Sequence, residues 1–143
     1  MAPPLPCACT ALRKASRAVA RVYEHALAQA DLTATQFAVL RALERHGGAA
    51  PLSRLADELV LERTSLYRAL TPLGRAQLVR FAGTADRRAK AVALTRTGRA
   101  RIAAALPYWK AAHGAFVERF GRARWGATAA VLDEAVRVAQ EIG

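Results

Sequence analysis

Apolar residues recur at helical spacing along most of the 143-residue chain. Between residues 10 and 30 they stand three and four positions apart, the period of an amphipathic helix: Leu12, Ala15, Val19, Val22, Tyr23, Ala26 and Leu27. A second helix is predicted to begin at Thr33, because Gln36 stands at the capping-box position three residues later. It is expected to end at His46-Gly47-Gly48, where glycine favours a helix stop.

Two further helices are predicted in close succession. Pro51 is expected to open a short third helix, since proline is favoured at the first helical position. A fourth helix, from Glu62 to Gln77, follows a brief break at Val60-Leu61 and is expected to bend at Pro72. Its inward-facing residues are Leu66, Leu70 and Leu73.

The pattern then changes from helix to strand. Residues 78–81 and 91–94 alternate with a period of two, which predicts a β-hairpin, and residues 82–90 form a polar loop with a basic tip. Two long helices are predicted after it, from Thr95 or Thr97 to Phe120 and from Ala123 to Ile142. We therefore expect a mainly α fold of about six helices with a small β-hairpin wing, a winged helix-turn-helix.

Charge narrows the choice of partner. There are 22 Lys and Arg residues against 11 Asp and Glu, a formal charge of +11, and arginine dominates. Such an excess favours a polyanion. Arginine-rich coding from a GC-rich genome is an alternative, but it explains arginine over lysine and not basic over acidic. No apolar run is long enough to span a bilayer, and residues 1–6 lack the basic start of a secretory signal, so no membrane partner and a cytoplasmic location are expected.

Polar and basic residues gather at two places that suit DNA. The first is the start of the fourth predicted helix, where a helix in the major groove would contact base edges: Arg63, Thr64, Ser65, Tyr67 and Arg68. The second is the hairpin tip, where Arg87, Arg88 and Lys90 would reach phosphates or the minor groove. The alternative is a solvated charged face on an ordinary helical domain.

These residues resemble the MarR family of bacterial transcriptional regulators. The resemblance is carried by Leu32-Thr33, Gln36-Phe37, Leu52 to Ala56, Arg63 to Leu66, and above all Asp86-Arg87-Arg88 followed by Leu94-Thr95-Arg96-Thr97-Gly98. It implies a homodimer on a palindromic operator in double-stranded DNA, with Arg88 at the wing tip and Asp86 bracing the wing. It also implies small phenolic or aromatic effectors in a cleft. One departure is Gln77, where the family often has glycine.

The resemblance also implies how the chain is divided. Residues 1–9 are expected to be a tail and residues 10–143 a single domain. Within it, residues 10–30 and 96–142 are the dimerisation helices and residues 33–95 the winged helix-turn-helix. Independently of the resemblance, the first and last helices carry more apolar surface than a small lobe can cover, including Tyr108, Trp109, Phe116, Phe120 and Trp125.

Cys7 and Cys9 precede the first predicted helix, where the helix dipole lowers the pKa of a thiol. The first helix resembles that of the MarR members that sense organic hydroperoxides, which implies that Cys9 is reactive and that Tyr23 bonds to it. Arg13 replaces a second tyrosine of that site. Cys7 is a candidate resolving thiol, but a disulfide across one residue is strained. Inert cysteines, a redox switch and soft-metal binding remain open at this point.

These observations favour a sequence-specific DNA-binding transcriptional regulator. We expect a repressor released by a small effector or by thiol oxidation. The alternative is a non-specific or architectural nucleic-acid-binding protein, which would show a steep salt dependence without preference for an operator. No metal motif, phosphate-binding glycine loop or nucleophile elbow occurs, so neither an enzyme nor a cofactor is expected.

Overall fold

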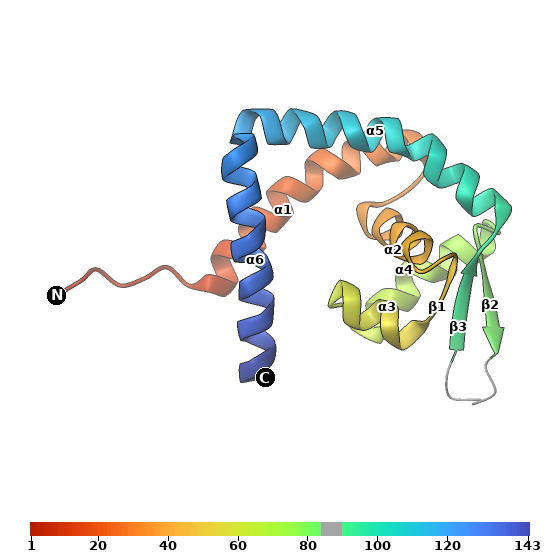
Figure 1. The fold of residues 1–143 in the computed structure, drawn as a ribbon, viewed down its shortest axis with the longest axis horizontal. Coiled ribbons are helices and arrows are strands. Elements are labelled where there is room, and N and C mark those ends of the chain that lie inside the picture. Colours follow the sequence, from red (N-terminus) through yellow and green to blue (C-terminus); the bar gives the residue numbers. More distant parts are fainter. Residues whose placement is uncertain (84–89) are drawn as a thin grey trace. The chain divides into compact units, whose positions relative to one another are not determined.

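The computed structural model describes residues 1–83 and 90–143, and Figure 1 shows their helices and strands. The elements are α1 Ala8–Leu27, the 3-10 turn η1 Ala28–Ala30, α2 Ala34–Arg45, β1 Ala49–Pro51, α3 Leu52–Leu59, α4 Arg63–Arg75, β2 Val79–Gly83, β3 Lys90–Leu94, α5 Arg96–Phe120 and α6 Arg122–Ile142. The predicted fold class, mainly α with a small β wing, is confirmed. The chain forms two compact units, residues 1–109 and 110–143.

Helix α2 begins as the sequence predicts. The Gln36 backbone N–H donates to Thr33 Oγ1 at 3.0 Å, and the Thr33 N–H donates to Gln36 Oε1 at 2.9 Å, which completes a capping box. A third amide at this end, that of Ala34, donates to Glu24 Oε1 of α1 at 2.9 Å. The cap therefore also ties α2 to α1.

The sheet has one strand more than predicted. Strand β1 pairs with β3 on the side opposite β2, giving the order β1-β3-β2. Pro51 ends this strand and is the N-cap of α3, in an extended conformation, rather than the first helical residue as expected. Proline is tolerated there because β1 is an edge strand. Lys90, expected in the loop, pairs with Gly83 as the first residue of β3.

Helix α4 ends earlier than predicted, at Arg75, and ends with a left-handed residue. Gln77 has φ of 59°, and the amides of Gln77 and Leu78 donate to Gly74 O and Leu73 O at 3.0 and 2.9 Å. This is a Schellman motif, in which glycine usually fills the left-handed position. Gln77 therefore adopts the conformation that glycine would, and the departure from the MarR pattern leaves the helix end unchanged in kind.

The start of α5 is hydrogen-bonded to the end of α4. Thr95 Oγ1 accepts from the Gly98 N–H at 2.9 Å and donates to Gln77 O at 2.6 Å, so one hydroxyl caps α5 and holds the end of α4. A Cβ on Gly98 would lie 2.0 Å from Leu78 O. Only a residue without a side chain fits this approach.

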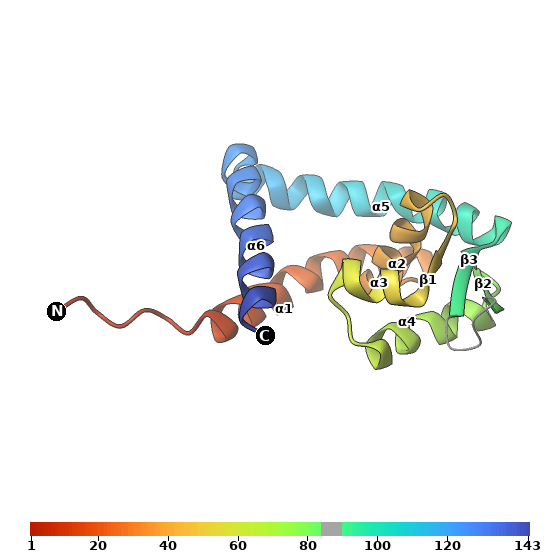
Figure 2. The ribbon, with the colours of Figure 1, turned by 60° about the horizontal axis from the view of Figure 1, so that its bottom comes forward.

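The core of the first unit lies among α2, α3, α4 and the sheet. Its buried leucines include the three of α4 that were predicted to face inward, Leu66, Leu70 and Leu73. They also include Leu40, Leu43, Leu55 and Leu78. Figure 2 shows the short turn that joins α3 to α4. In the second unit, Phe116, Phe120 and Trp125 pack with ring centroids 5.4–6.0 Å apart, around the turn between α5 and α6.

Candidate nucleic-acid interface and ligand pocket

The first two turns of α4 carry the predicted base-reading residues. Arg63, Thr64 and Arg68 are exposed, while Ser65 and Tyr67 are half-buried. Among the described residues, no side chain caps the start of α4: its N-cap, Glu62, makes no capping hydrogen bond. The first amides of the helix are therefore open to an external acceptor, the arrangement that suits a phosphate oxygen.

The structure brings one predicted wing residue, Lys90, to helix α4. Lys90 Nζ of β3 lies 5.9 Å from the ring centroid of Tyr67, a cation–π contact between the base of the wing and α4. One residue of each polar and basic cluster predicted from the sequence, Tyr67 and Lys90, is therefore in contact with the other. The other predicted wing residues, Asp86, Arg87 and Arg88, lie outside the described residues.

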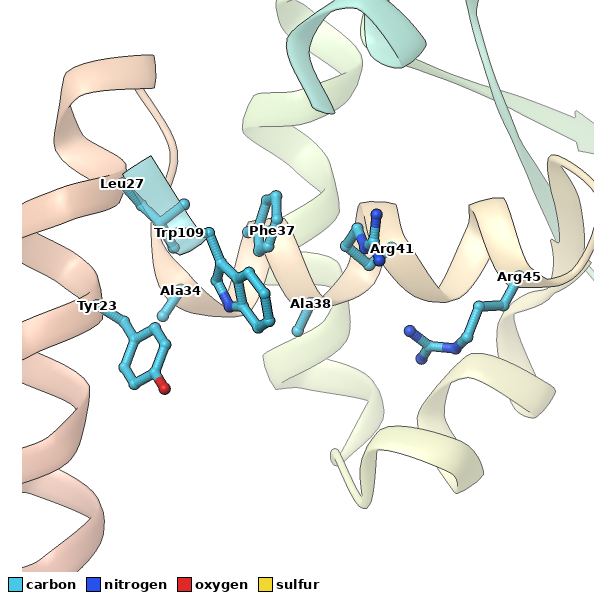
Figure 3. A pocket seen from close by; sticks show the side chains of 8 residues that line it. All are labelled: Tyr23, Leu27, Ala34, Phe37, Ala38, Arg41, Arg45 and Trp109. Atoms are coloured by element: carbon cyan, nitrogen blue, oxygen red, sulfur yellow. The ribbon is translucent and has the colours of Figure 1, made fainter. Parts of the chain in front are cut away.

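A pocket lies in the first unit, and Figure 3 shows its lining side chains; the MarR resemblance implied a cleft for small aromatic effectors but did not give its lining. Its volume is about 310 Å³, within the range of small-molecule sites. Trp109 packs between two other rings, 6.5 Å from Tyr23 and 6.3 Å from Phe37. Further along α2, Arg41 and Arg45 add two guanidinium groups. The combination of rings and cations suits a planar anion.

Both pocket arginines are held by carboxylates. Arg41 Nη1 lies 3.1 Å from Glu44 Oε2 on the same helix. Arg45 Nη2 lies 2.8 Å from Glu58 Oε1 on α3, and the other oxygen of Glu58 lies 2.5 Å from His46 Nε2. The hydrogen bonds from Arg45 and then from His46 hold the pKa of Glu58 below its ordinary value.

The spacing along α2 is the signal that could have revealed this pocket. Phe37, Arg41 and Arg45 stand four residues apart and share one helix face. Trp109 was expected among the core, interface or cleft-lining aromatics. Its packing on Tyr23 and Phe37 depends on how α5 lies against α1 and α2, which no local pattern specifies.

The cysteines lie at the start of the first helix, which begins at Ala8 rather than at residue 10 as predicted. Cys7 is the N-cap of α1 and Cys9 lies in its first turn, and both thiols are free and exposed. The backbone and then the side chain of Thr10, followed by the backbone of Cys9, lower the pKa of Cys7 by hydrogen bonding to its thiolate.

Within one chain, Tyr23 is not near these thiols. Cys9 and Tyr23 both lie on α1, so a rise of 1.5 Å per residue separates them by about 21 Å. Tyr23 instead lines the pocket, and burial raises its pKa. A bond between Tyr23 and Cys9 would therefore require a second chain.

Residues 1–83 and 90–143 contain no three His, Cys, Asp or Glu side chains grouped so that they would hold a metal ion. Within the same residues, no helix combines the length and apolar character needed to cross a bilayer.

Helix α3, a tight turn, helix α4 with its exposed polar start and the β2–β3 hairpin define a winged helix-turn-helix DNA-binding protein. The MarR family model matches residues 32–90. The solved structure of the M. tuberculosis transcriptional regulator MosR in complex with DNA is 32% identical, with a TM-score of 0.85, over 95% of this chain and 98% of that one. The chain belongs to the MarR family of transcriptional regulators.

Two other solved structures are similar to the chain. The transcriptional regulator PA4135 is 25% identical, with a TM-score of 0.83, over 94% of this chain and 98% of that one. BpsR of Bordetella bronchiseptica is 25% identical, with a TM-score of 0.77, over 89% and 96%. Its structure describes regulation of DNA binding by 6-hydroxynicotinic acid. Comparison with curated proteins finds no match. These relatives are transcriptional regulators rather than enzymes.

Proposed function

We propose that the chain is a sequence-specific repressor that binds double-stranded DNA as a homodimer, in the cytoplasm where the chromosome lies. The observation that carries this proposal is the open start of α4, with exposed Arg63, Thr64 and Arg68 and the cation of Lys90 stacked beside it. Residues 63–75 of helix α4 include no acidic residue, and the one carboxylate at its start belongs to the N-cap Glu62. The similar MosR structure holds DNA, which supports the same use of this surface.

Each predicted site residue has a proposed role. The α4 residues Arg63, Thr64, Ser65, Tyr67 and Arg68 read bases or adjacent phosphates. In the wing, Lys90 contacts phosphate. Arg87 and Arg88, which the sequence places at the basic hairpin tip, enter the minor groove or contact phosphate, and Asp86 braces the wing. The role of Asp86 and the wing-tip position of Arg88 rest on the MarR resemblance.

The dimer is proposed from apolar surface. Helix α6, described throughout, contains no buried residue although its sequence is rich in valine and alanine. Val131 and Ile142 of α6 are 66% and 82% exposed, and Leu12 and Val22 of α1 are also exposed. Apolar surface of this kind marks an interface. We assign residues 10–30 and 96–142 to dimerisation and residues 33–95 to DNA binding, which makes the operator palindromic.

Release is proposed through the pocket lined by Trp109, Tyr23 and Phe37. Its three rings stack on a planar ligand, and Arg41 and Arg45 neutralise a carboxylate. The ligand class is therefore a small aromatic carboxylate. The regulation of BpsR by 6-hydroxynicotinic acid, an aromatic carboxylic acid, supports this class.

Thiol oxidation is a second proposed route. A thiolate attacks one peroxide oxygen of an organic hydroperoxide, which gives a sulfenic acid and releases the alcohol. Cys9 remains the candidate drawn from the MarR resemblance, and the lowered pKa of Cys7 favours Cys7 as the first thiol to react.

The test is a footprint on the DNA upstream of the protein's own gene, with and without an organic hydroperoxide. We expect a palindromic footprint that Arg68→Ala weakens about ten- to hundredfold, as loss of a base contact does. Arg122→Ala, an exposed arginine of the other unit, is the matched control and should bind normally. Equal binding to random DNA with a steep salt dependence would instead favour the architectural alternative.

A further inference from the structure

Arg45 takes part in both the pocket and an ion pair between two helices. Its side chain lines the pocket, and its guanidinium donates to Glu58 of α3 at 2.8 Å. Arg41, the other pocket cation, also has a carboxylate partner, but that partner is Glu44 on the same helix α2. The Arg45–Glu58 pair therefore joins two helices, whereas the Arg41–Glu44 pair joins none.

Glu58 lies at a sensitive place in the helix-turn-helix. It is in the last turn of α3, and Val60 two residues later adopts a left-handed conformation with φ of 51°. A β-branched residue is strained in that conformation, so surrounding contacts must hold it. Arg63, the first residue of α4, follows three residues later. Glu58 thus ties the end of α3 to α2 immediately before the turn into the recognition helix.

We infer that an aromatic carboxylate in the pocket takes Arg45 away from Glu58, and that loss of this pair loosens the turn between α3 and α4. The inference rests on the proposed effector role of the pocket and names its path to the recognition helix. The ligand carboxylate and the Glu58 carboxylate compete for one guanidinium and repel each other across it. The DNA-binding arrangement of α3 and α4 and the occupied pocket are therefore antagonistic, and the antagonism is reciprocal.

The expected effect is modest, because the pair is partly solvated: the Arg45 side chain is 56% exposed and that of Glu58 is 32% exposed. Pairs of this kind change an equilibrium by about two- to fivefold. Because the ligand and Glu58 weaken each other's hold on Arg45 by the same factor, removing the Glu58 charge should tighten binding of the carboxylate ligand by that factor.

Calorimetric titration of the full-length protein with benzoate tests this, with benzamide as a neutral ligand of the same shape. We expect Glu58→Gln to bind benzoate about two- to fivefold more tightly than wild type, and benzamide equally. Glu44→Gln is the matched control, since it frees the other pocket arginine without touching α3, and it should also tighten benzoate binding. Circular dichroism checks that both variants fold.

Amide hydrogen exchange separates the two variants. The amides of Val60 and Leu61 donate to Asp57 O and Ala56 O at 3.2 and 2.9 Å, so their exchange reports the turn. Benzoate should speed exchange there in wild type and in Glu44→Gln, whereas Glu58→Gln should exchange fast without ligand and respond no further.

Three results would overturn the inference: no benzoate binding to wild type at millimolar concentration, equal benzoate affinity of wild type and Glu58→Gln, or unchanged exchange of the turn on binding. Each of these is measured without DNA. Failure of the proposed function, by contrast, would be seen as the absence of a footprint from the unliganded wild-type protein.

Discussion

Gly98 gives the sharpest test of how the wing is joined to the rest of the first unit. It lies in the first turn of α5, where its N–H donates to Thr95 Oγ1 and its Cα faces the Leu78 carbonyl. We predict that Gly98→Ala destabilises the protein, although alanine is ordinarily the better helix residue. The added Cβ would stand 2.0 Å from Leu78 O and 3.0 Å from Leu78 C.

The size of the effect follows from these distances. Carbon–oxygen contacts between backbone segments settle at about 3.3–3.6 Å, so the two backbones must separate by more than about 1 Å. Neither partner is a side chain that can rotate away. Such overpacking costs about 1–3 kcal/mol, against a gain of up to about 1 kcal/mol from replacing a helical glycine. We expect a net loss of about 1–2 kcal/mol, which lowers Tm by about 3–6 °C.

The assay is thermal and urea unfolding at one fixed protein concentration, since association would shift the transition. Gly114→Ala is the control: Gly114 lies in the same helix, and nothing stands within 4 Å of its would-be Cβ. It should raise stability by up to about 1 kcal/mol. A Gly98→Ala protein as stable as wild type would refute the close approach between α5 and Leu78.

Three further predictions concern single side chains. Thr33→Ala should lower the unfolding free energy by about 1 kcal/mol in urea titrations, because it removes the capping box of α2; an unchanged midpoint would argue against the cap. Iodoacetamide should label Cys7 faster than it labels a free cysteine below the pH at which free thiols ionise, and Thr10→Ala should slow the labelling of Cys7; peptide mass spectrometry measures both rates, and labelling of Cys7 no faster than that of free cysteine would contradict the lowered pKa. Because the pKa of Glu58 is lowered in the folded protein, its ion pairs stabilise the protein above the pH at which a free glutamate titrates. The stability difference from Glu58→Gln, no more than about 1 kcal/mol, should vanish as the pH falls through the folded pKa.

Local pattern was enough to predict the helices and to nominate residues of α4 for DNA contact. The Thr33 cap, the break at Val60-Leu61 and the buried α4 leucines each depend on residues within one helix length of each other. Strand β1 was missed because Ala49-Ala50-Pro51 has neither β-branched residues nor alternation. It exists because β3, whose paired residues stand 40 to 44 positions later in the chain, offers a partner.

The lining of the pocket and its ion pairs could not be specified from the sequence, for the same reason. Arg45 and Glu58 stand 13 residues apart on different helices, and Lys90 and Tyr67 meet only because the hairpin folds back toward α4. Contacts of this kind depend on tertiary packing, so residue type alone could nominate Lys90 and Tyr67 for DNA but could not pair them.

Residues with left-handed backbone conformations at the helix ends can be exchanged in ways that change local rigidity. Among the described residues, Asp31, Val60 and Gln77 adopt positive φ without being glycine, and the last two stand on either side of α4. Each such position holds about 1 kcal/mol or more of backbone strain that a glycine would relieve. Exchanging residues 60 and 77 can thus change how rigidly α4, the proposed recognition helix, is held. Such changes alter how easily α4 moves relative to the rest of the first unit, while they leave every proposed DNA-contacting side chain unchanged.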